Sequence, residues 1–474
     1  MPGERCDVTA TELDDAGCGV GTSEGRRIHA VDLLPGERAE IAIDHASPHR
    51  PEAWGRIVRR LGAASADRVT PQCPAFGRCG GCTWQHLAYP AQLVAKRRRV
   101  VDALAAVPAV RGGAVAIADV RPSPDQLGYR NKGKYVVGRA PRATDPGMGA
   151  TSPAESVHVV LGAYAPRTHT VIDTIGCRVV APIIDEIATW VRGAAERAQL
   201  VPYEEATRAG ELRYVVVREA AGDVLVALVV ATGTPRGKLE KVADALSRHP
   251  AVRGLVAIAN DRRDGAIVPS GSSAQVLLGH GYLVEQLAGV SVAVGVAEFL
   301  QVNRAQAGAL YARVAELALT ASAGAPRVAV ELYAGLGGIG LTLARAGVRV
   351  VAAEIDPDAV AQLRRAAERA GLPLEALAGD AAELGPELRA RLEADGALGI
   401  AVVNPPRKGL SDGARALLVE LSPATIVYVS CAPDSLARDL VALADHGYTP
   451  DAIEPFDLMP GTAQVETVVR LRRA

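Results

Sequence analysis

Apolar and polar positions alternate regularly along the last third of the chain. Short, almost purely apolar runs are separated by longer segments that have the apolar spacing of helices. Runs of this kind are typical of parallel strands buried on both faces, with helices covering the sheet. Residues 291–474 are therefore predicted to form a Rossmann-like α/β domain with a seven-stranded sheet. The runs lie at residues 328–333, 348–354, 374–378, 399–403, 426–429, 449–455 and 465–471.

Two different patterns precede this domain. Residues 1–62 contain short, alternating strands broken by glycines, which predict a five-stranded barrel of the oligonucleotide-binding (OB-like) kind. A generic barrel that binds no nucleic acid fits the same pattern. Residues 63–290 alternate strands, such as 212–218 and 224–230, with a helix at 236–248. This segment is predicted to be a central α/β domain.

Composition narrows the class of protein. The chain has 474 residues, of which 49% are hydrophobic and 4% aromatic, and this suits α/β layers in two or three domains. The formal net charge of −1 excludes a nucleic-acid binder that works by bulk charge, so RNA contacts would need local basic patches. No apolar run is long enough to span a membrane, and the N-terminus lacks the apolar segment of a secretory signal. We therefore expect a cytoplasmic protein with no membrane partner.

Three cysteines lie close together in a loop rich in glycine and proline. Cys73, Cys79 and Cys82 have the spacing C-x5-C-x2-C, and such grouped thiolates typically bind a metal or a cluster. An iron–sulfur cluster needs a fourth cysteine, whereas zinc could use His86. The spacing favours the cluster over zinc. The cysteines that could supply the fourth ligand are Cys6, Cys18, Cys177 and Cys431.

Two segments carry basic residues that could contact RNA phosphates. Residues 92–101 predict a helix with a basic face, and residues 129–135 interleave cations with tyrosines. Cations neutralise phosphates and aromatic rings stack on bases, so both segments are plausible RNA contacts. An ordinary solvated helix face and an ordinary edge strand are the alternatives.

A glycine-rich turn at residues 334–340 joins the first apolar run of the last domain to a helix. Glu354 ends the next run about twenty residues after Gly335, which is the spacing of an acid that binds ribose hydroxyls. No lysine follows the turn, which argues against an ATP phosphate loop. Asp380 and Asn404 end the two runs after that. Acids and amides without a phosphate clamp favour S-adenosylmethionine over NAD.

Cys431 follows the fifth run directly, and Pro433 suits the first turn of the next helix. Open α/β sheets bind their ligands at the carboxyl ends of strands, and a helix N-terminus favours a thiolate. Cys431 is therefore a candidate nucleophile. The alternative is a buried cysteine that packs as a small hydrophobic residue.

Taken together, the motifs resemble those of the RNA uracil-5-methyltransferases, and most closely the iron–sulfur branch that acts on large-subunit ribosomal RNA. The resemblance covers nearly the whole chain, and residues 1–62 are similar to the TRAM domain of that family. The matching segments are residues 73–82 with Cys177, 129–132, 299–303, 331–335, 404–409, 429–433, and 460–462 with Glu466.

The resemblance implies both the reaction and the residues that perform it. Cys431 would attack carbon 6 of a uridine, and Glu466 would be the general base that removes the proton from carbon 5. The substrate would be RNA, with large-subunit ribosomal RNA favoured and transfer RNA as the alternative, and the enzyme a monomer. Contacts to S-adenosylmethionine would come from Gln301, Tyr333, Gly338, Glu354, Asp380 and Asn404. A 4Fe–4S cluster would be held by Cys73, Cys79, Cys82 and Cys177.

Two positions depart from the family pattern. Asn404 replaces an aspartate, and Gln464 replaces a histidine two residues before the base. A catalytically weakened RNA-binding protein on the same scaffold is therefore a second hypothesis. The Asn-Pro-Pro sequence is also similar to that of amino-methyltransferases. Those enzymes have an aromatic residue where this chain has Arg407, and they need no cysteine on the following strand.

Overall fold

The computed structural model describes residues 3–14, 16–139, 158–166, 168–269, 271–320, 328–393 and 398–473. These residues form two compact units, each assembled from separate stretches of the chain. The first unit comprises Met1–Gln72, Gly81–Gln126 and Ala305–Ala474. The second comprises Cys73–Gly80 and Leu127–Arg304.

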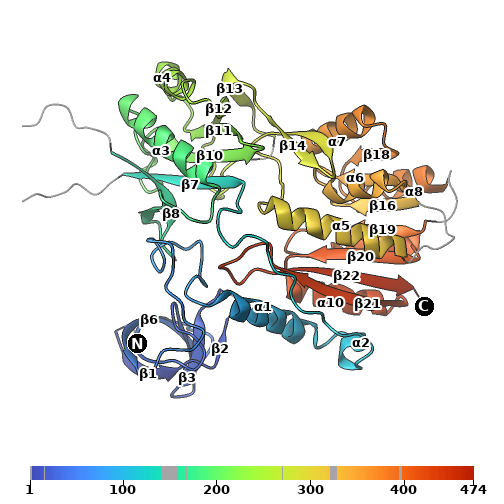
Figure 1. Ribbon diagram of the computed structural model, residues 1–474, viewed down its shortest axis with the longest axis horizontal. Helices are drawn as coiled ribbons and strands as arrows, with labels where there is room; N and C mark the ends of the chain where they lie inside the picture. The colour runs from blue at the N-terminus through green and yellow to red at the C-terminus, as the bar shows by residue number, and fades with distance from the viewer. Residues whose placement is uncertain are drawn as a thin grey trace, which may run out of the picture. The chain divides into compact units, whose positions relative to one another are not determined.

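A seven-stranded sheet forms the centre of the first unit, as predicted (Figure 1). Its strand order is β18-β17-β16-β19-β20-β22-β21, so the order reverses between β16 and β19, and ligands commonly bind at such a point. The strands β16 to β20 run parallel, whereas β22 is antiparallel to β20 and β21. The strands are β16 (Val328–Leu332), β17 (Arg349–Glu354), β18 (Leu374–Ala378), β19 (Ile400–Val403), β20 (Thr425–Ser430), β21 (Tyr448–Phe456) and β22 (Glu466–Arg473).

Helices connect the parallel strands. α7 shows why they begin where they do: the side chain of Asp356 accepts a hydrogen bond from the Asp358 amide, and Pro357 occupies the first turn. The helix α1 comes from much earlier in the chain, yet Val100 and Leu104 lie in the same buried core as the sheet strands. The helices of this unit are α1 (Tyr89–Leu104), α2 (Pro108–Arg111), α5 (Arg304–Thr320, whose first residue belongs to the second unit), α6 (Gly338–Arg345), α7 (Pro357–Arg369), α8 (Gly385–Glu393), α9 (Asp412–Leu421) and α10 (Pro433–Ala444).

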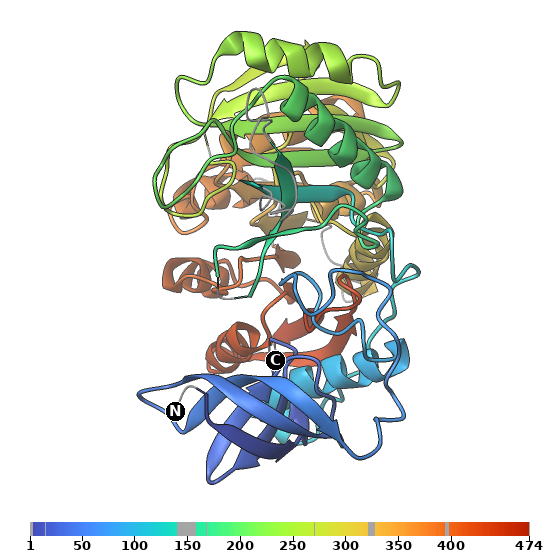
Figure 2. The same ribbon diagram turned by 90° about the vertical axis from the view of Figure 1, so that its left-hand side faces the viewer.

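The N-terminal segment forms a six-stranded sheet in the order β1-β5-β6-β4-β3-β2, drawn in blue in Figure 2. The prediction of five strands is therefore wrong in number. Exposed arginines on this sheet are paired with acids, as Arg38 is with Asp7 at 2.7 Å. The strands are β1 (Arg5–Thr9), β2 (Glu12–Leu13), β3 (Gly19–Ser23), β4 (Arg26–Ala30), β5 (Arg38–Ala46) and β6 (Glu52–Leu61).

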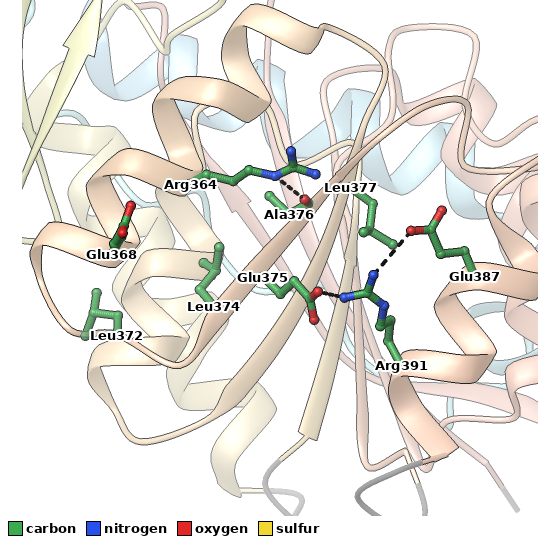
Figure 3. A pocket seen from close by; sticks show the side chains of 9 residues that line it. All are labelled: Arg364, Glu368, Leu372, Leu374, Glu375, Ala376, Leu377, Glu387 and Arg391. Atoms are coloured by element: carbon green, nitrogen blue, oxygen red, sulfur yellow. Dashed lines mark hydrogen bonds and ion pairs between the residues drawn. The ribbon is translucent and has the colours of Figure 1, made fainter.

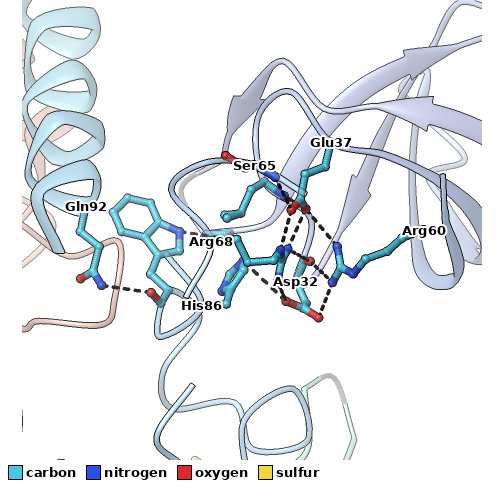
Figure 4. Close-up of polar contacts among 10 residues, drawn as sticks. Asp32, Glu37, Arg60, Ser65, Arg68, His86 and Gln92 are labelled. Atoms are coloured by element: carbon cyan, nitrogen blue, oxygen red, sulfur yellow. Dashed lines mark hydrogen bonds and ion pairs between the residues drawn. The ribbon is translucent and has the colours of Figure 1, made fainter. Parts of the chain in front are cut away.

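A polar network attaches the segment after β6 to this sheet (Figure 4). Arg68 donates hydrogen bonds to both Glu37 and Asp32, and Arg60 reaches the same two carboxylates. Burial alone would raise the pKa of Glu37, but the hydrogen bonds from Arg68 and from the amides of Leu34 and Ser65 outweigh it and lower that pKa to about 2. The network fixes the start of the connection that leads to α1.

The second unit contains a seven-stranded sheet in the order β13-β12-β11-β10-β7-β8-β9. It also contains a two-stranded hairpin of β14 and β15. The central strands and the helix that the sequence predicts here are confirmed. The elements are β7 (Lys132–Arg139), β8 (Val159–Tyr164), β9 (Val171–Asp173), α3 (Pro182–Arg197), β10 (Leu212–Ala220), β11 (Asp223–Val230), α4 (Arg236–Leu246), β12 (Val252–Ala259), β13 (Ala274–Gly279), β14 (Leu283–Leu287) and β15 (Val290–Val294).

Among all described residues of both units, no helix combines the length and the apolar character that crossing a membrane requires.

Candidate active site

The predicted site residues of the first unit gather at one edge of its sheet. The glycine turn follows β16, and Glu354 ends β17, while Asp380, Asn404 and Cys431 follow β18, β19 and β20. Glu466 begins β22, which runs antiparallel to β20 with Ser430 opposite Thr467. That register places the start of β22 next to the end of β20. The strand topology therefore brings Glu466 to Cys431.

The turn after β16 has backbone and packing requirements that only certain residues meet. Tyr333 has a φ of 63°, which is rare for a side chain of its size and common at functional sites. Gly337 has a φ of 81°, and a Cβ there would lie 2.3 Å from Leu363. A Cβ on Gly338 would lie 2.5 Å from the ring of Tyr311. A side chain at Gly337 or Gly338 would therefore clash with the packing around the turn, whereas a Cβ on Gly335 would meet nothing within 4 Å.

Glu354 holds the glycine turn against the end of β17. One carboxylate oxygen accepts a hydrogen bond from the Gly335 amide at 2.7 Å, and the other accepts one from the Asp356 amide at 3.0 Å. Each oxygen retains a second acceptor site, so the carboxylate can still receive ribose hydroxyls.

The other two strand-end residues are also held by backbone contacts. The exposed Asp380 accepts a hydrogen bond from the Ala382 amide at 2.8 Å. The backbone amide of Asn404 donates to the carbonyl of Leu332, which links the ends of β19 and β16. An open glycine turn flanked by two carboxylates and an amide fits the ribose, adenine and amino-acid parts of S-adenosylmethionine.

The charge of Glu466 acts on the pKa of Cys431, and Arg407 acts on both groups. Burial raises the pKa of the Cys431 thiol, the charge of Glu466 raises it further, and the charge of Arg407 opposes both effects. Burial likewise raises the pKa of Glu466 to about 8, again opposed by Arg407. The expectation that the helix N-terminus favours the thiolate concerns one influence only, and burial, the largest of the causes, raises the pKa of the thiol overall.

Arg407 is a site residue that the sequence prediction did not assign a role. Its guanidinium donates a hydrogen bond to the Gln464 side-chain oxygen at 3.0 Å. Its backbone carbonyl accepts one from Ser435 on α10 at 2.7 Å. The Asn-Pro-Pro-Arg motif marked the position, but only the structure shows that its charge acts on Cys431 and Glu466.

A buried carboxylate on α10 fixes the segment that carries Arg407. Asp439 is fully buried and accepts hydrogen bonds from the Leu410 amide at 2.8 Å and the Tyr428 hydroxyl at 2.7 Å. Arg438 donates to the Lys408 carbonyl at 2.7 Å. The segment after β19 is therefore tied to both β20 and α10.

Glu331 is a second residue that the sequence prediction left without a role. It lies on β16 and is 1% exposed, with one carboxyl oxygen that has no hydrogen-bond partner. Burial raises its pKa to about 8, the Gly340 amide lowers it, and the charge of Glu354 raises it. A Cβ on Gly340 would lie 2.3 Å from that oxygen, so glycine is needed to accommodate the carboxyl group.

Gln301 belongs to the second unit. Its backbone carbonyl accepts a hydrogen bond from the Asn131 side chain at 3.2 Å, and the residue is buried. Lys132 donates to the Val296 carbonyl at 2.5 Å, and Tyr135 is 3% exposed. Residues 132 and 135 therefore hold the unit together, and the expectation that residues 129–135 present free cations and aromatics, or form an edge strand, is wrong for them. β7 lies between β10 and β8.

The predicted cluster ligands fall in both units. Cys73, Cys79 and Cys177 lie in the second unit and Cys82 in the first, and none is in a disulfide. Across the described ranges, no group of three or more histidine, cysteine, aspartate or glutamate side chains is arranged to hold a metal ion.

A cavity of about 330 Å³ lies on the outer side of the same sheet, between α7, β18 and α8 (Figure 3). Arg391 pairs with Glu375 in its wall, and Arg364 donates to the Ala376 carbonyl at 2.7 Å. None of the predicted site residues lines it.

Comparison with known proteins identifies the family. No protein-family model matches the chain. An uncharacterized RNA methyltransferase of Halalkalibacterium halodurans is 31% identical and aligns over 98% of this chain and 96% of its own length. An uncharacterized RNA methyltransferase of Nitratidesulfovibrio vulgaris is 33% identical and aligns over 99% of this chain and 96% of its own length. The chain belongs to the RNA methyltransferase family of these relatives.

This RNA methyltransferase family member also has the fold of a solved structure. The Pyrococcus abyssi tRNA (uracil-54, C5)-methyltransferase in complex with S-adenosyl-L-homocysteine superimposes with a TM-score of 0.74. The match covers 98% of this chain and 99% of that one, at 24% sequence identity. The resemblance identified from the motifs is confirmed at the level of the RNA methyltransferases.

Proposed function

We propose that this protein transfers a methyl group from S-adenosylmethionine to carbon 5 of a uridine in RNA. The observation that carries the proposal is the antiparallel pairing of β20 with β22. This pairing brings the Cys431 thiol next to the Glu466 carboxyl group, at the edge of the sheet where the glycine turn lies. The relatives are named RNA methyltransferases, and the protein of the same fold is named for uracil C5 and was crystallised with S-adenosyl-L-homocysteine.

Cys431 acts as the nucleophile in this proposal. Carbon 5 of uracil is a weak nucleophile until the thiolate adds to carbon 6, which leaves an enolate that is nucleophilic at carbon 5. S-adenosylmethionine supplies the electrophilic methyl group. Arg407 assists because its positive charge lowers the pKa of the thiol, whereas burial raises that pKa.

Glu466 acts as the general base in the second half of the reaction. Its carboxylate takes the proton from carbon 5, the electrons of that C–H bond form the double bond between carbons 5 and 6, and the sulfur leaves carbon 6 as the thiolate. Burial suits Glu466 to this task because a base with a pKa of about 8 is stronger than an ordinary carboxylate.

The cofactor would be held by the turn and the strand ends. Glu354 would bind the ribose hydroxyls, Asp380 the adenine amine, and the backbone at Tyr333 and Gly338 would approach the ligand closely. Asn404 and Gln301 are proposed as further contacts, on the resemblance of their motifs. Asn404 keeps an acceptor oxygen there without a charge.

Large-subunit ribosomal RNA is the substrate that the motifs favour, and transfer RNA is the alternative. The N-terminal sheet, as a TRAM-like barrel, is proposed to bind RNA. Its surface ion pairs, such as Arg38 with Asp7, are individually weak and can be exchanged for phosphates.

We also propose a 4Fe–4S cluster on Cys73, Cys79, Cys82 and Cys177, resting on their spacing and on the family motif. Anaerobic purification should yield a brown protein with iron and sulfide in comparable amounts. A colourless protein that contains zinc would exclude the cluster.

Two substitutions test the reaction. Cys431→Ala should abolish methylation of RNA while binding of S-adenosylmethionine, measured by calorimetry, is retained. Glu466→Gln should accumulate a covalent protein–RNA adduct on denaturing gels, because the last proton cannot be removed. Turnover by Cys431→Ala would exclude the mechanism. RNA binding by the unmodified protein without any methylation would favour the second hypothesis, a catalytically weakened RNA-binding protein, for which Asn404 and Gln464 are the motivating departures.

A further inference from the structure

Three polar residues of α1 lie on one face of that helix and contact a single distant loop. Gln92, Lys96 and Arg99 are separated by four and three positions, a spacing that aligns side chains along one side of a helix. The loop comprises residues 457–465, between β21 and β22, and we call it the base loop because Glu466 follows it directly. Helix and loop both belong to the first unit.

Gln92 secures the middle of the base loop. Its side-chain oxygen accepts a hydrogen bond from the Gly461 amide at 2.8 Å. Its side-chain nitrogen donates to the carbonyls of Trp84 at 3.1 Å and Leu87 at 2.8 Å, which hold the amide in that orientation. Gln92 is 5% exposed, so these bonds are made away from water.

Lys96 and Arg99 secure the two ends of the same loop. The ammonium group of Lys96 donates to the Asp457 carboxylate at 2.5 Å and to the Met459 carbonyl at 3.0 Å. Arg99 donates to the carbonyl of Ala463. Lys96 is completely buried, so neither the predicted RNA contact nor its alternative, a solvated helix face, applies to it.

The base loop transmits this anchoring to the site. The Thr462 hydroxyl donates to the Met459 carbonyl at 2.8 Å and accepts from the Gln464 amide at 3.2 Å. Gln464 in turn accepts the hydrogen bond from Arg407, and Glu466 lies two residues further on. Each link from α1 to Glu466 is therefore a hydrogen bond or one or two residues of backbone.

We propose that α1 positions the general base, and that Gln92, Lys96 and Arg99 are positioning residues for Glu466. This inference rests on the proposed function. A base must lie within hydrogen-bonding reach of the proton it removes, and small displacements of a catalytic group reduce the rate strongly. The pairing with β20 sets the register of β22, whereas the base loop has no strand or helix of its own and is held by its contacts with α1.

The inference predicts a defect in one step only. Formation of the bond between Cys431 and carbon 6 does not use Glu466, whereas removal of the carbon 5 proton does. RNA that contains 5-fluorouridine separates the two steps, because fluorine cannot leave carbon 5 as a proton does, and the adduct is trapped whatever the state of the base.

The test compares Gln92→Met with the unmodified protein on in vitro transcripts of large-subunit ribosomal RNA, made with uridine or with 5-fluorouridine. We expect methyl turnover on uridine RNA to fall at least about tenfold, while trapping on 5-fluorouridine RNA stays within about twofold. Gln92→Glu keeps an oxygen for the Gly461 amide and should restore much of the turnover. Val94→Gln is the matched control, because Val94 lies on the same helix and is 70% exposed.

The outcomes separate this inference from the proposed function. If the unmodified protein traps neither the ribosomal transcript nor a transfer-RNA transcript made with 5-fluorouridine, the proposed function fails. If Glu466→Gln loses turnover but traps normally, while Gln92→Met turns over like the unmodified protein, the positioning role of α1 is excluded. Equal losses of turnover and trapping in Gln92→Met would show a role in folding alone and would also overturn it.

Discussion

Lys96 and Asp457 form an ion pair of 2.5 Å between side chains that are both completely buried. They stand 361 positions apart in the sequence, so the pair joins the start of the first unit's helical layer to the loop before its last strand. Burial lowers the pKa of Lys96, and the charge of Asp457 opposes that change. Removing either partner would leave the other buried without a compensating group.

Removing one partner of this pair should destabilise the protein strongly. Lys96→Met leaves Asp457 buried without its cation, and we expect a loss of about 3–5 kcal/mol in the free energy of unfolding. Lys96→Met with Asp457→Leu replaces both charges by apolar groups and should recover most of that loss. Urea denaturation of the three proteins measures it. A double variant as unstable as the single one would show that the ion pair is not the cause.

Glu331 should make stability depend on pH. Its pKa is about 8 in the folded protein, against an ordinary value of 4.5, so the folded state holds a proton that the unfolded state has released between those values. The free energy of unfolding should therefore fall as pH rises from 4.5 to 8, by at most about 1.4 kcal/mol per pH unit from this group. Glu331→Gln should flatten the curve in denaturant titrations. An unchanged slope would assign the dependence to other groups, such as Glu466.

A structural feature of this protein can be predicted from the sequence when the residues that form it are close together in the chain. The strands of the seven-stranded sheet are local apolar runs, and all of them were predicted. The two-residue β2 is too short to leave a pattern, so the sixth N-terminal strand was missed. The polar side chains at 92, 96 and 99 look solvent-facing in sequence because their partners lie at the other end of the chain.

The site shows the same division. The glycine turn, the acidic residues and the Cys431 thiol all lie at the ends of strands. The ends of strands can be predicted from the sequence. The raised pKa of Cys431 could not be predicted from the sequence. A helix N-terminus is visible in the sequence, whereas burial and the opposing charges of Glu466 and Arg407 depend on tertiary packing. Glu331 and Tyr311 were missed for that reason too, since only packing brings them to the glycine turn.

Arg407 should control the reactivity of the thiol. Its charge lowers the pKa of Cys431, so Arg407→Met should raise that pKa and slow alkylation by iodoacetamide at pH 8. We expect a slowing of about two- to fivefold, modest because Arg407 is exposed and its charge is screened. Gln464→Ala removes the hydrogen bond but keeps the charge, and should have a smaller effect. Faster alkylation in Arg407→Met would contradict this role.

Gly338 should tolerate no side chain while Tyr311 is present. A Cβ would lie 2.5 Å from the tyrosine ring, so Gly338→Ala should cost about 1–3 kcal/mol of stability and weaken binding of S-adenosylmethionine. Combining it with Tyr311→Ala removes the ring and should relieve the strain caused by the new methyl group. Thermal denaturation and calorimetric titration of the single and double variants measure the coupling. Independent, additive effects would show that ring and glycine do not compete for the same space.

The pH dependence of the last chemical step should report Glu466. Its pKa of about 8 means that the carboxyl group is protonated below pH 8 and cannot accept the carbon 5 proton, so the base form falls about tenfold for each pH unit below that value. The thiolate of Cys431 also increases with pH, and trapping on 5-fluorouridine RNA reports that titration alone. The single-turnover rate at which free methylated RNA is released from the covalent adduct, divided by the rate of trapping, should therefore rise with pH and level off near pH 8. A plateau already reached near pH 5 would mean that Glu466 keeps an ordinary carboxyl pKa, and the buried base would lose its physical advantage.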